Sequence, residues 1–267
     1  MNEFVAPGHR FDAVLIGTDV SRGAAAVTRA GGVVAARLDW GGELGMVGRP
    51  VLLVEAEGAD EQTIADALPA IARFAAERGC KVVAAFDLPA LDAVAAALMD
   101  LKGVELLCEP DLPERVAAVL RASAPEPEPD ATVREDGPPD RPPYQPEPPA
   151  GEAPPPQELR RAIRARRLRD GFFMSGLFAD PAWDMLLDLY AAELEDQPVS
   201  VSSLCIAAAV APTTALRWIA RMTEDGLLER QPDHQDRRRA FMSLTEVARV
   251  GMRGYLLALR RAGLQIG

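Results

Sequence analysis

The chain is poor in the side chains that build metal sites and disulfides. It has three cysteines far apart in apolar segments, Cys80, Cys108 and Cys205, and only two histidines, His9 and His234. No Cys-x-x-Cys pair and no Cys/His cluster occurs, so a structural zinc site is not expected. Such cysteines are typical of a reducing compartment, and we expect a cytoplasmic protein that needs no cofactor.

Long apolar runs and the signatures of several enzyme classes are also missing. No stretch of eighteen apolar residues occurs, and the N-terminus lacks the apolar core of a signal peptide, so neither a membrane span nor secretion is expected. The only lysines are Lys81 and Lys102, and no P-loop, Gly-x-Ser-x-Gly or Gly-x-Gly-x-x-Gly motif is found. An α/β enzyme with a site near Asp19, Glu55 and Asp87 is therefore the least favoured hypothesis.

A proline-rich segment divides the chain. Residues 123–157 hold 13 of the 23 prolines, with eight acidic residues among them. Proline removes backbone donors and like charges repel, so this segment is expected to be an extended, disordered linker. The sequence therefore predicts a multidomain protein, with one domain over 1–122 and a second over 158–267.

The net charge of −11 is unevenly distributed along the chain. Residues 1–122 carry 11 basic and 18 acidic side chains, whereas residues 158–267 carry 16 basic and 14 acidic ones, and the basic ones are clustered. An acidic part joined to a locally basic part is typical of a regulator whose basic end meets phosphate. Alternatively, the clustered charges are solvated helix faces.

The segment after the linker contains a helix-turn-helix pattern. Ser200 is placed to cap a short helix, and a second helix opens at Pro212 or Thr213 and ends at Gly226. The expected apolar stripe of the second helix is Ala215, Trp218, Ile219 and Met222, and its polar side carries Thr213, Thr214, Arg217 and Arg221. Threonines and arginines on a helix that fits the major groove can reach base edges and phosphates.

A β-hairpin is predicted to follow this second helix. Short strands at 227–230 and 240–244 flank a polar loop at 231–239, and a further helix starts at 245. A helix-turn-helix followed by a hairpin is a winged helix. The loop ends in three arginines, Arg237, Arg238 and Arg239, which suit a narrow, electronegative minor groove.

The stretch TTALRWIARMTEDGLLERQPDHQDRRRAFMSLTEVAR resembles the MarR-type winged-helix transcription regulators. The motifs that carry this resemblance are Gly226-Leu227-Leu228, the wing run Asp233, Asp236, Arg237 and Arg238, and the closing Ser243-Leu244-Thr245. The resemblance extends over residues 158 to about 265. It implies double-stranded DNA as a partner and a homodimer formed by the first and last helices of this domain.

The resemblance also assigns roles to individual side chains. It implies that Thr213, Thr214 and Arg217 read the major groove, while Arg237 and Arg238 enter the minor groove. Asp233 and Asp236 would hold the wing arginines in place. Gln235 stands where the family often has an arginine.

Three further features leave alternatives open. Arg221 could contact phosphate or form an ion pair with Asp225, four residues on. The six arginines in 160–169 could contact phosphate or form a solvated face of a dimerisation helix. Trp218 is interpreted as a core residue, and His234 as an exposed wing residue.

Residues 11–122 alternate apolar runs with helical patterns. Strands are expected at 11–17, 33–38, 50–55, 81–86 and 104–108, and helices at 22–30, 61–78, 89–101 and 112–122. The glycine-rich crossover at 39–49 is expected to have little or no helix. This alternation predicts a doubly wound parallel sheet of flavodoxin-like topology.

This segment resembles the receiver domains of two-component response regulators. LLCEPDLPERVAAVL is similar to the last strand and helix of a receiver, with Glu109-Pro110 where receivers have Lys-Pro. The resemblance places Glu55 at the phosphoryl-accepting aspartate and Gly17-Thr18-Asp19 at the metal-binding acidic pair. Because phosphoryl capture needs an aspartate, a metal and a lysine, we predict a degenerate receiver site that takes no phosphate.

Glu55 itself has two interpretations. It is either a strand-end carboxylate in solvent or a permanent mimic of a phosphorylated aspartate. The whole chain is interpreted as a DNA-binding transcription regulator and not as an enzyme. The alternative is an interaction module or signalling adaptor that binds a partner protein or a small-molecule effector, with a winged helix that does not bind DNA.

Overall fold

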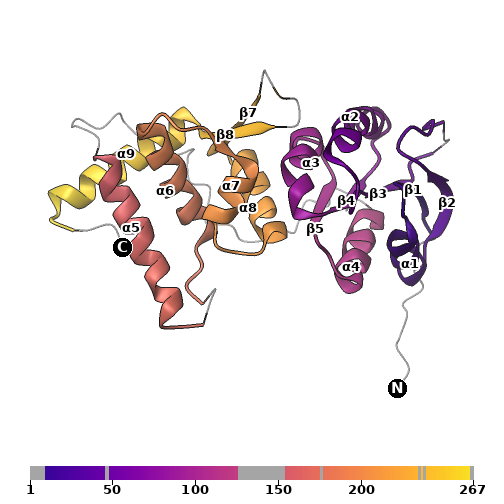
Figure 1. Cartoon of the computed structure of the whole chain (residues 1–267), viewed down its shortest axis with the longest axis horizontal. Coiled ribbons are helices and arrows are strands. Elements are labelled where there is room, and N and C mark those ends of the chain that lie inside the picture. Colours follow the sequence, from indigo (N-terminus) through magenta and orange to yellow (C-terminus); the bar gives the residue numbers. More distant parts are fainter. Residues whose placement is uncertain are drawn as a thin grey trace, which may run out of the picture. The chain divides into compact units, whose positions relative to one another are not determined.

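The computed structural model describes residues 10–45, 48–125, 154–174, 177–233, 236 and 239–264. The chain divides into two compact units on either side of the proline-rich segment (Figure 1). Most of the expected linker, residues 126–153, lies outside the described residues. Its two ends differ from expectation, because Ser123 closes one helix and Pro156 opens the next.

The N-terminal unit is built on a parallel sheet of five strands in the order β2-β1-β3-β4-β5. The strands are β1 Asp12–Ile16, β2 Val33–Leu38, β3 Val51–Glu55, β4 Val82–Phe86 and β5 Val104–Cys108. Every residue of β3 and β4 is buried, as their nearly continuous apolar sequences predict for central strands. The predicted five-stranded parallel sheet is therefore confirmed.

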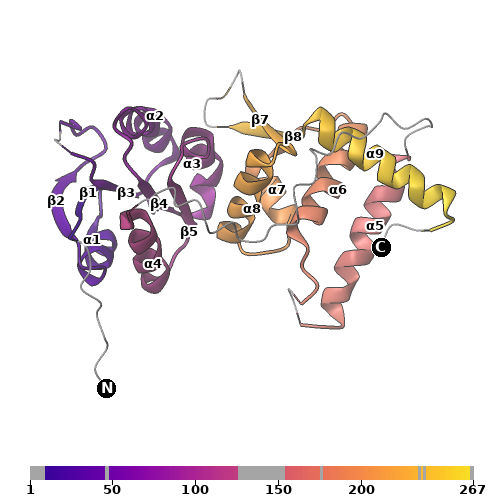
Figure 2. The ribbon, with the colours of Figure 1, turned by 180° about the vertical axis from the view of Figure 1, so that it is seen from behind.

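Helices cover both faces of this sheet (Figures 1 and 2). Helices α1 (Ser21–Arg29) and α4 (Leu112–Ser123) pack together on one face, and α2 (Glu61–Arg78) and α3 (Leu91–Leu98) on the other, where the 3₁₀ helix Leu88–Ala90 leads into α3. None of the described residues between β2 and β3 is helical, in agreement with the glycine-rich sequence there.

Local capping explains where two of these helices begin. The Asp60 carboxylate accepts a hydrogen bond from the Thr63 backbone N–H (2.9 Å) at the start of α2. At the start of α4, Asp111 and Glu114 form a reciprocal capping box.

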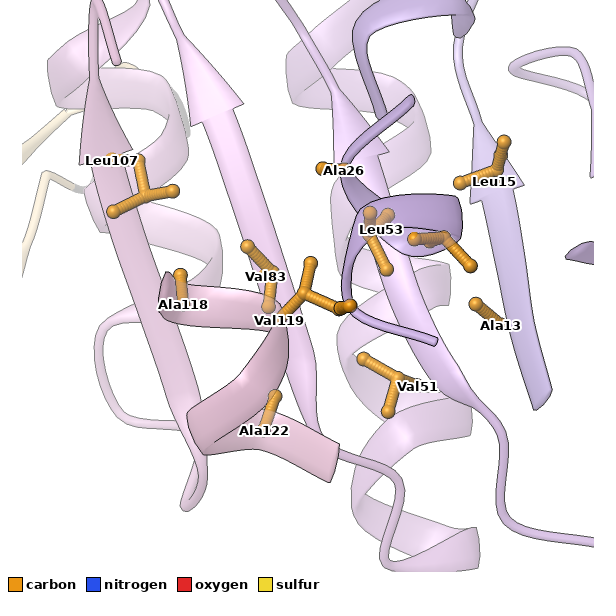
Figure 3. Packing of buried hydrophobic residues seen from close by; sticks show 12 residues of the cluster. Ala13, Leu15, Ala26, Val51, Leu53, Val83, Leu107, Ala118, Val119 and Ala122 are labelled. Atoms are coloured by element: carbon orange, nitrogen blue, oxygen red, sulfur yellow. The ribbon is translucent and has the colours of Figure 1, made fainter. Parts of the chain in front are cut away.

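Figure 3 shows the hydrophobic core of the N-terminal unit between the sheet and helices α1 and α4, with Leu53, Val83 and Val119 near its centre.

All three cysteines are buried and none forms a disulfide. Burial raises the pKa of the Cys108 thiol to about 11, and the neighbouring carboxylates of Glu109 and Asp87 add to the shift. A thiol with so high a pKa is a poor nucleophile at neutral pH. We therefore interpret Cys108 as a core residue.

The C-terminal unit has the order of elements of a winged helix. Its helices are α5 Pro156–Leu168, the 3₁₀ helix Arg169–Gly171, α6 Pro181–Leu194, α7 Val201–Ala207, α8 Pro212–Glu224 and α9 Glu246–Arg261. The strands β6 Val199–Ser200, β7 Leu228–Pro232 and β8 Ala240–Leu244 form an antiparallel sheet in the order β6-β8-β7. The two-residue strand β6 was not expected, because a pattern with period two cannot be recognised over two residues.

In the described part of the chain, no single helix is both long enough and apolar enough to cross a membrane. Helices α7 and α8 pass that test only as a pair, and they are bent by 107° at the turn between them.

Candidate nucleic-acid interface and a buried ion-pair cluster

The outer face of α8 is the candidate surface for a major groove. Pro212 occupies the first turn of the helix, and Gly226 takes a left-handed conformation (φ 70°) just after its end. Four residues on one side of α8 are exposed, at positions i, i+3, i+4 and i+7: Thr214, Arg217, Trp218 and Arg221. Neighbours at these spacings share one face of a helix, so the four side chains form a continuous stripe.

Two residues of α8 lie on the opposite side from the one expected. Thr213 was placed on the polar face but is only 9% exposed, and Trp218 was placed in the core but is 40% exposed. Leu216 occupies the buried stripe with Ile219 and Met222 instead. Trp218 matches the i, i+3, i+4, i+7 spacing of Ala215, Ile219 and Met222, and Leu216 only the i+3 spacing to Ile219, yet packing in the folded domain buries Leu216.

Arg221 forms an ion pair at the C-terminal end of this face. Its Nε lies 2.9 Å from Oδ2 of Asp225, and this hydrogen bond raises the pKa of the arginine. Both side chains are largely exposed, and such surface pairs add little stability. In the absence of DNA, Arg221 therefore forms the ion pair with Asp225 that was one of its two interpretations.

The wing aspartates shape the backbone of the loop between β7 and β8. The Asp236 N–H donates to the Asp233 carboxylate (3.3 Å), the Asp233 N–H to the Arg239 carbonyl (3.1 Å), and the Arg239 N–H to the Asp236 carbonyl (3.0 Å). Arg239 is exposed. Arg237 and Arg238, like His234 and Gln235, lie outside the described residues.

The arginines of α5 do not form a uniform basic face. Arg160 pairs with Asp188 (2.5 Å) and Glu195 (2.7 Å), and Arg166 pairs with Asp184 (2.7 Å). These ion pairs connect α5 to α6 and to Glu195, which directly follows α6. The guanidinium of Arg167 donates to the Ala207 carbonyl, whereas Arg161 and Arg164 are exposed.

In the N-terminal unit, the expected receiver site contains a buried ion pair. Glu55, at the end of β3, is only 5% exposed, which corrects the interpretation that it is a strand-end carboxylate in solvent. The guanidinium of Arg115, in α4, binds both Glu55 and Glu57, and Arg115 itself is 2% exposed. Arg22, in α1, lies 3.3 Å from Glu57 on the outer side of this cluster.

The Glu55 carboxyl is crowded as well as buried. Burial raises its pKa above the ordinary value, Arg115 opposes that shift, and the nearby Glu57 carboxylate adds to it. A Cβ at Gly23 would lie 2.5 Å from Oε1 of Glu55, and one at Gly17 would lie 2.4 Å from its backbone oxygen. Glycine at both positions therefore gives Glu55 the room it occupies.

The other residues of the expected receiver site have local roles. The Asp19 carboxylate accepts a hydrogen bond from the Ser21 N–H (3.0 Å), which lowers the pKa of Asp19. Glu109 is exposed, with φ 50°, and its N–H donates to the Phe86 carbonyl (2.8 Å). Asp87, named for the enzyme hypothesis, accepts a hydrogen bond from the Gly58 N–H (2.7 Å).

Arg115 was missed by reasoning from the sequence, although a signal for it exists. It stands at position i of a stripe continued by Ala118, Val119 and Ala122 at i+3, i+4 and i+7, all buried. An arginine on the apolar stripe of a helix needs a buried acidic partner, because an unpaired charge is costly there. The position of Arg115 on this stripe therefore predicts a buried acidic partner without identifying it as Glu55.

Two open pockets lie beside these features. One, of about 490 Å³, is lined by residues from α1 and the start of α4: Ser21, Arg22, Ala25, Pro110, Asp111, Leu112 and Arg115. The other, of about 510 Å³, lies within the C-terminal unit and is lined by residues of α6, the three-stranded sheet and α9, among them Glu193 and Arg249. In the described residues, no group of three or more His, Cys, Asp or Glu side chains is arranged to hold a metal ion.

Several solved structures are similar to a part of this chain. A complex of S. aureus MepR with DNA is 15% identical and covers 40% of this chain and 80% of its own, with a TM-score of 0.28. The heme complex of the heme sensor PefR from Streptococcus agalactiae is 18% identical and covers 40% and 75%, with a TM-score of 0.28. A probable transcriptional regulator from Pseudomonas aeruginosa is 25% identical and covers 39% and 76%, with a TM-score of 0.27.

The match to a family covers a smaller part of the chain. The search of curated proteins found no match to this chain. The family described as a winged helix DNA-binding domain matches residues 186–248, which run from within α6 to the start of α9. Together with the order of helices and strands, this match shows that the C-terminal unit contains a winged-helix domain.

Proposed function

We propose that this protein is a transcription regulator that binds double-stranded DNA through its winged helix. The observation that carries the proposal is the exposed stripe of Thr214, Arg217, Trp218 and Arg221 on α8, the second helix of the helix-turn-helix. In the proposed complex this stripe enters the major groove, and Arg237 to Arg239 of the wing enter the neighbouring minor groove. Thr213 is buried and is therefore omitted from the proposed contacts.

The proposal includes a MarR-like homodimer formed through the first and last helices of the C-terminal unit. An exposed apolar segment at the end of α5 and after it supports a protein–protein contact in this region: Leu168, Phe172, Phe173, Met174, Leu177 and Phe178. Arg161 and Arg164 on α5 remain available for phosphate or for a partner.

The N-terminal unit is proposed to be a receiver-like regulatory or dimerisation domain that takes no phosphate. Its strand order, β2-β1-β3-β4-β5, is that of flavodoxin-like sheets. The carboxylate at the receiver position is already bound by Arg115 and enclosed near Gly23. A phosphoryl group needs a free carboxylate and a bound metal, and this cluster supports neither requirement.

A second candidate function is a protein-interaction adaptor whose winged helix does not bind DNA. It is favoured by the ion pairs that occupy Arg160 and Arg166, because these reduce the positive charge free for phosphate. In this case the winged helix or the acidic N-terminal unit would contact another protein, or a pocket such as the one of about 510 Å³ would bind an effector.

The test is binding of the full chain to a fluorescent duplex of random sequence between about 50 and 200 mM salt, where phosphate contacts change affinity steeply. DNA binding predicts tight association at the low-salt end and a steep loss as salt rises. No association at low salt would contradict the DNA-binding proposal. The adaptor function would then be tested by searching for proteins that bind the full chain through its acidic N-terminal unit.

A further inference from the structure

Trp218 lies on the stripe of α8 that is proposed to face DNA. It is 40% exposed, whereas the other large apolar side chains of this helix, Leu216, Ile219 and Met222, are at most 2% exposed. Trp218 follows Thr214 by four residues and precedes Arg221 by three, so it lies between them on the same face. Trp218 therefore adds an aromatic side chain to the candidate reading surface, beside Arg217.

The side chains around Trp218 provide the polar contacts, and the indole provides an apolar one. Thr214 and Arg217 carry hydroxyl and guanidinium groups, and Arg221 is held by Asp225. An indole has a single N–H donor and no acceptor, and the rest of its surface is apolar. Any base edge that Trp218 covers will thus mostly contact the apolar surface of the indole ring.

The major groove presents one apolar group, the C5 methyl of thymine. A guanine or cytosine edge in the same place would lose hydrogen bonds to water and find no replacement against the indole, which is unfavourable. A thymine methyl in that place loses no hydrogen bonds and buries apolar surface. We propose that Trp218 is a specificity-determining residue that selects a thymine by contact with its methyl group; the inference rests on the proposed DNA-binding function.

The experiment begins with selection of duplexes from a random library by the full-length protein. Each thymine of the selected site is then replaced by deoxyuridine, which removes the methyl group and leaves the hydrogen-bonding edge unchanged. At the thymine that Trp218 contacts, loss of one buried methyl should weaken wild-type binding by about fourfold. Trp218→Ala should bind less tightly and show no further loss with deoxyuridine at that position.

Two further variants make the result specific. Trp218→Phe keeps an aromatic face but lacks the N–H, so it should retain the dependence on the methyl group. Leu88→Ala removes a similarly exposed apolar side chain (48%) from the N-terminal unit and should leave both affinity and deoxyuridine sensitivity unchanged. The melting temperature of each variant verifies that it folds.

The outcomes separate this inference from the function on which it rests. If Trp218→Ala selects the same site with the same deoxyuridine sensitivity, DNA binding stands and the role of Trp218 is refuted. Loss of the methyl dependence in Trp218→Phe would also refute it, because an aromatic face at this position would then not be sufficient to contact the methyl group. Failure of the wild-type protein to select any duplex would overturn both the inference and the proposed function.

Discussion

Arg115 in α4 and Glu55 at the end of β3 are 60 residues apart in the sequence and form an ion pair in which neither side chain is more than 5% exposed. The same guanidinium also binds Glu57, so one arginine connects α4 to the centre of the sheet through two carboxylates. This cluster occupies the position where the receiver resemblance places the phosphoryl acceptor. It links the fold of the N-terminal unit to the proposal that the unit takes no phosphate.

Arg115→Met should destabilise the N-terminal unit strongly. The substitution leaves Glu55 buried without its partner, and breaking a buried pair in this way costs about 3 to 5 kcal/mol. The control is Arg121→Met on the same helix, because Arg121 pairs with Glu105 (2.8 Å) but is 48% exposed and should contribute less than about 1 kcal/mol. Hydrogen exchange of β3 and α4 in urea measures both effects, and equal destabilisation by the two variants would contradict the assignment.

The raised pKa of Glu55 predicts how stability depends on pH. The folded unit holds the Glu55 proton more tightly than the unfolded chain, so this group stabilises the fold fully below its ordinary pKa of 4.5. That contribution is lost as pH rises through the raised value. The free energy of unfolding of the wild-type chain, minus that of Glu55→Gln, should therefore decrease from pH 4.5 upward. A difference that increases with pH would show that Arg115 outweighs burial.

Gly23→Ala tests the close approach between α1 and Glu55. The added Cβ would lie 2.5 Å from Oε1 of Glu55, whose other oxygen, Oε2, is bound by Arg115, so the helix or the ion pair must shift. We expect a loss of about 1 to 3 kcal/mol in the free energy of unfolding. Gly41→Ala, where no atom lies within 4 Å of the added carbon, should stay within about 0.5 kcal/mol of the wild type.

The arginines of α5 should differ in their effects on the winged-helix unit. Arg160→Ala removes the pairs that join α5 to Asp188 within α6 and to Glu195 at its end, and should cost about 1 kcal/mol. Arg161→Ala, at the exposed neighbouring position, should leave stability within about 0.5 kcal/mol of the wild type. Thermal unfolding distinguishes the two, and a larger loss for Arg161→Ala would show that this arginine has a structural partner.

The wing arginines should control the salt dependence of DNA binding. The double variant Arg237→Ala/Arg238→Ala should bind random duplex more weakly, and the slope of log K against log salt should flatten by about 0.9 for each phosphate that the protein no longer neutralises. Lys102→Ala, which removes a positive charge from the N-terminal unit, is the control and should leave the slope unchanged. An unchanged slope in the double variant would remove the wing from the proposed interface.

The elements of this protein were predictable where the signal is local. Asp111 and Glu114 lie three residues apart and cap α4, and Ser200 caps α7 through the Ser203 N–H (3.1 Å). Runs of buried residues in β3 and β4 likewise follow from adjacent apolar side chains. Interactions of this kind involve neighbours within about one helical turn, so they are visible in the order of the residues.

Which side of α8 is buried, and which residue pairs with Glu55, depend on contacts between segments that are far apart in the sequence. Trp218 completes an i, i+3, i+4, i+7 stripe with Ala215, Ile219 and Met222, yet the rest of the domain buries Leu216 and leaves Trp218 exposed. Arg115 and Glu55 meet only after the sheet has formed and α4 has packed on it. Most helices and strands and the winged-helix pattern follow from the order of the residues, because they depend on near neighbours, whereas the two-residue strand β6 and the start of α5 at Pro156 do not. The folded chain decided which side chains are exposed and which charges pair, because close packing admits one arrangement of distant segments.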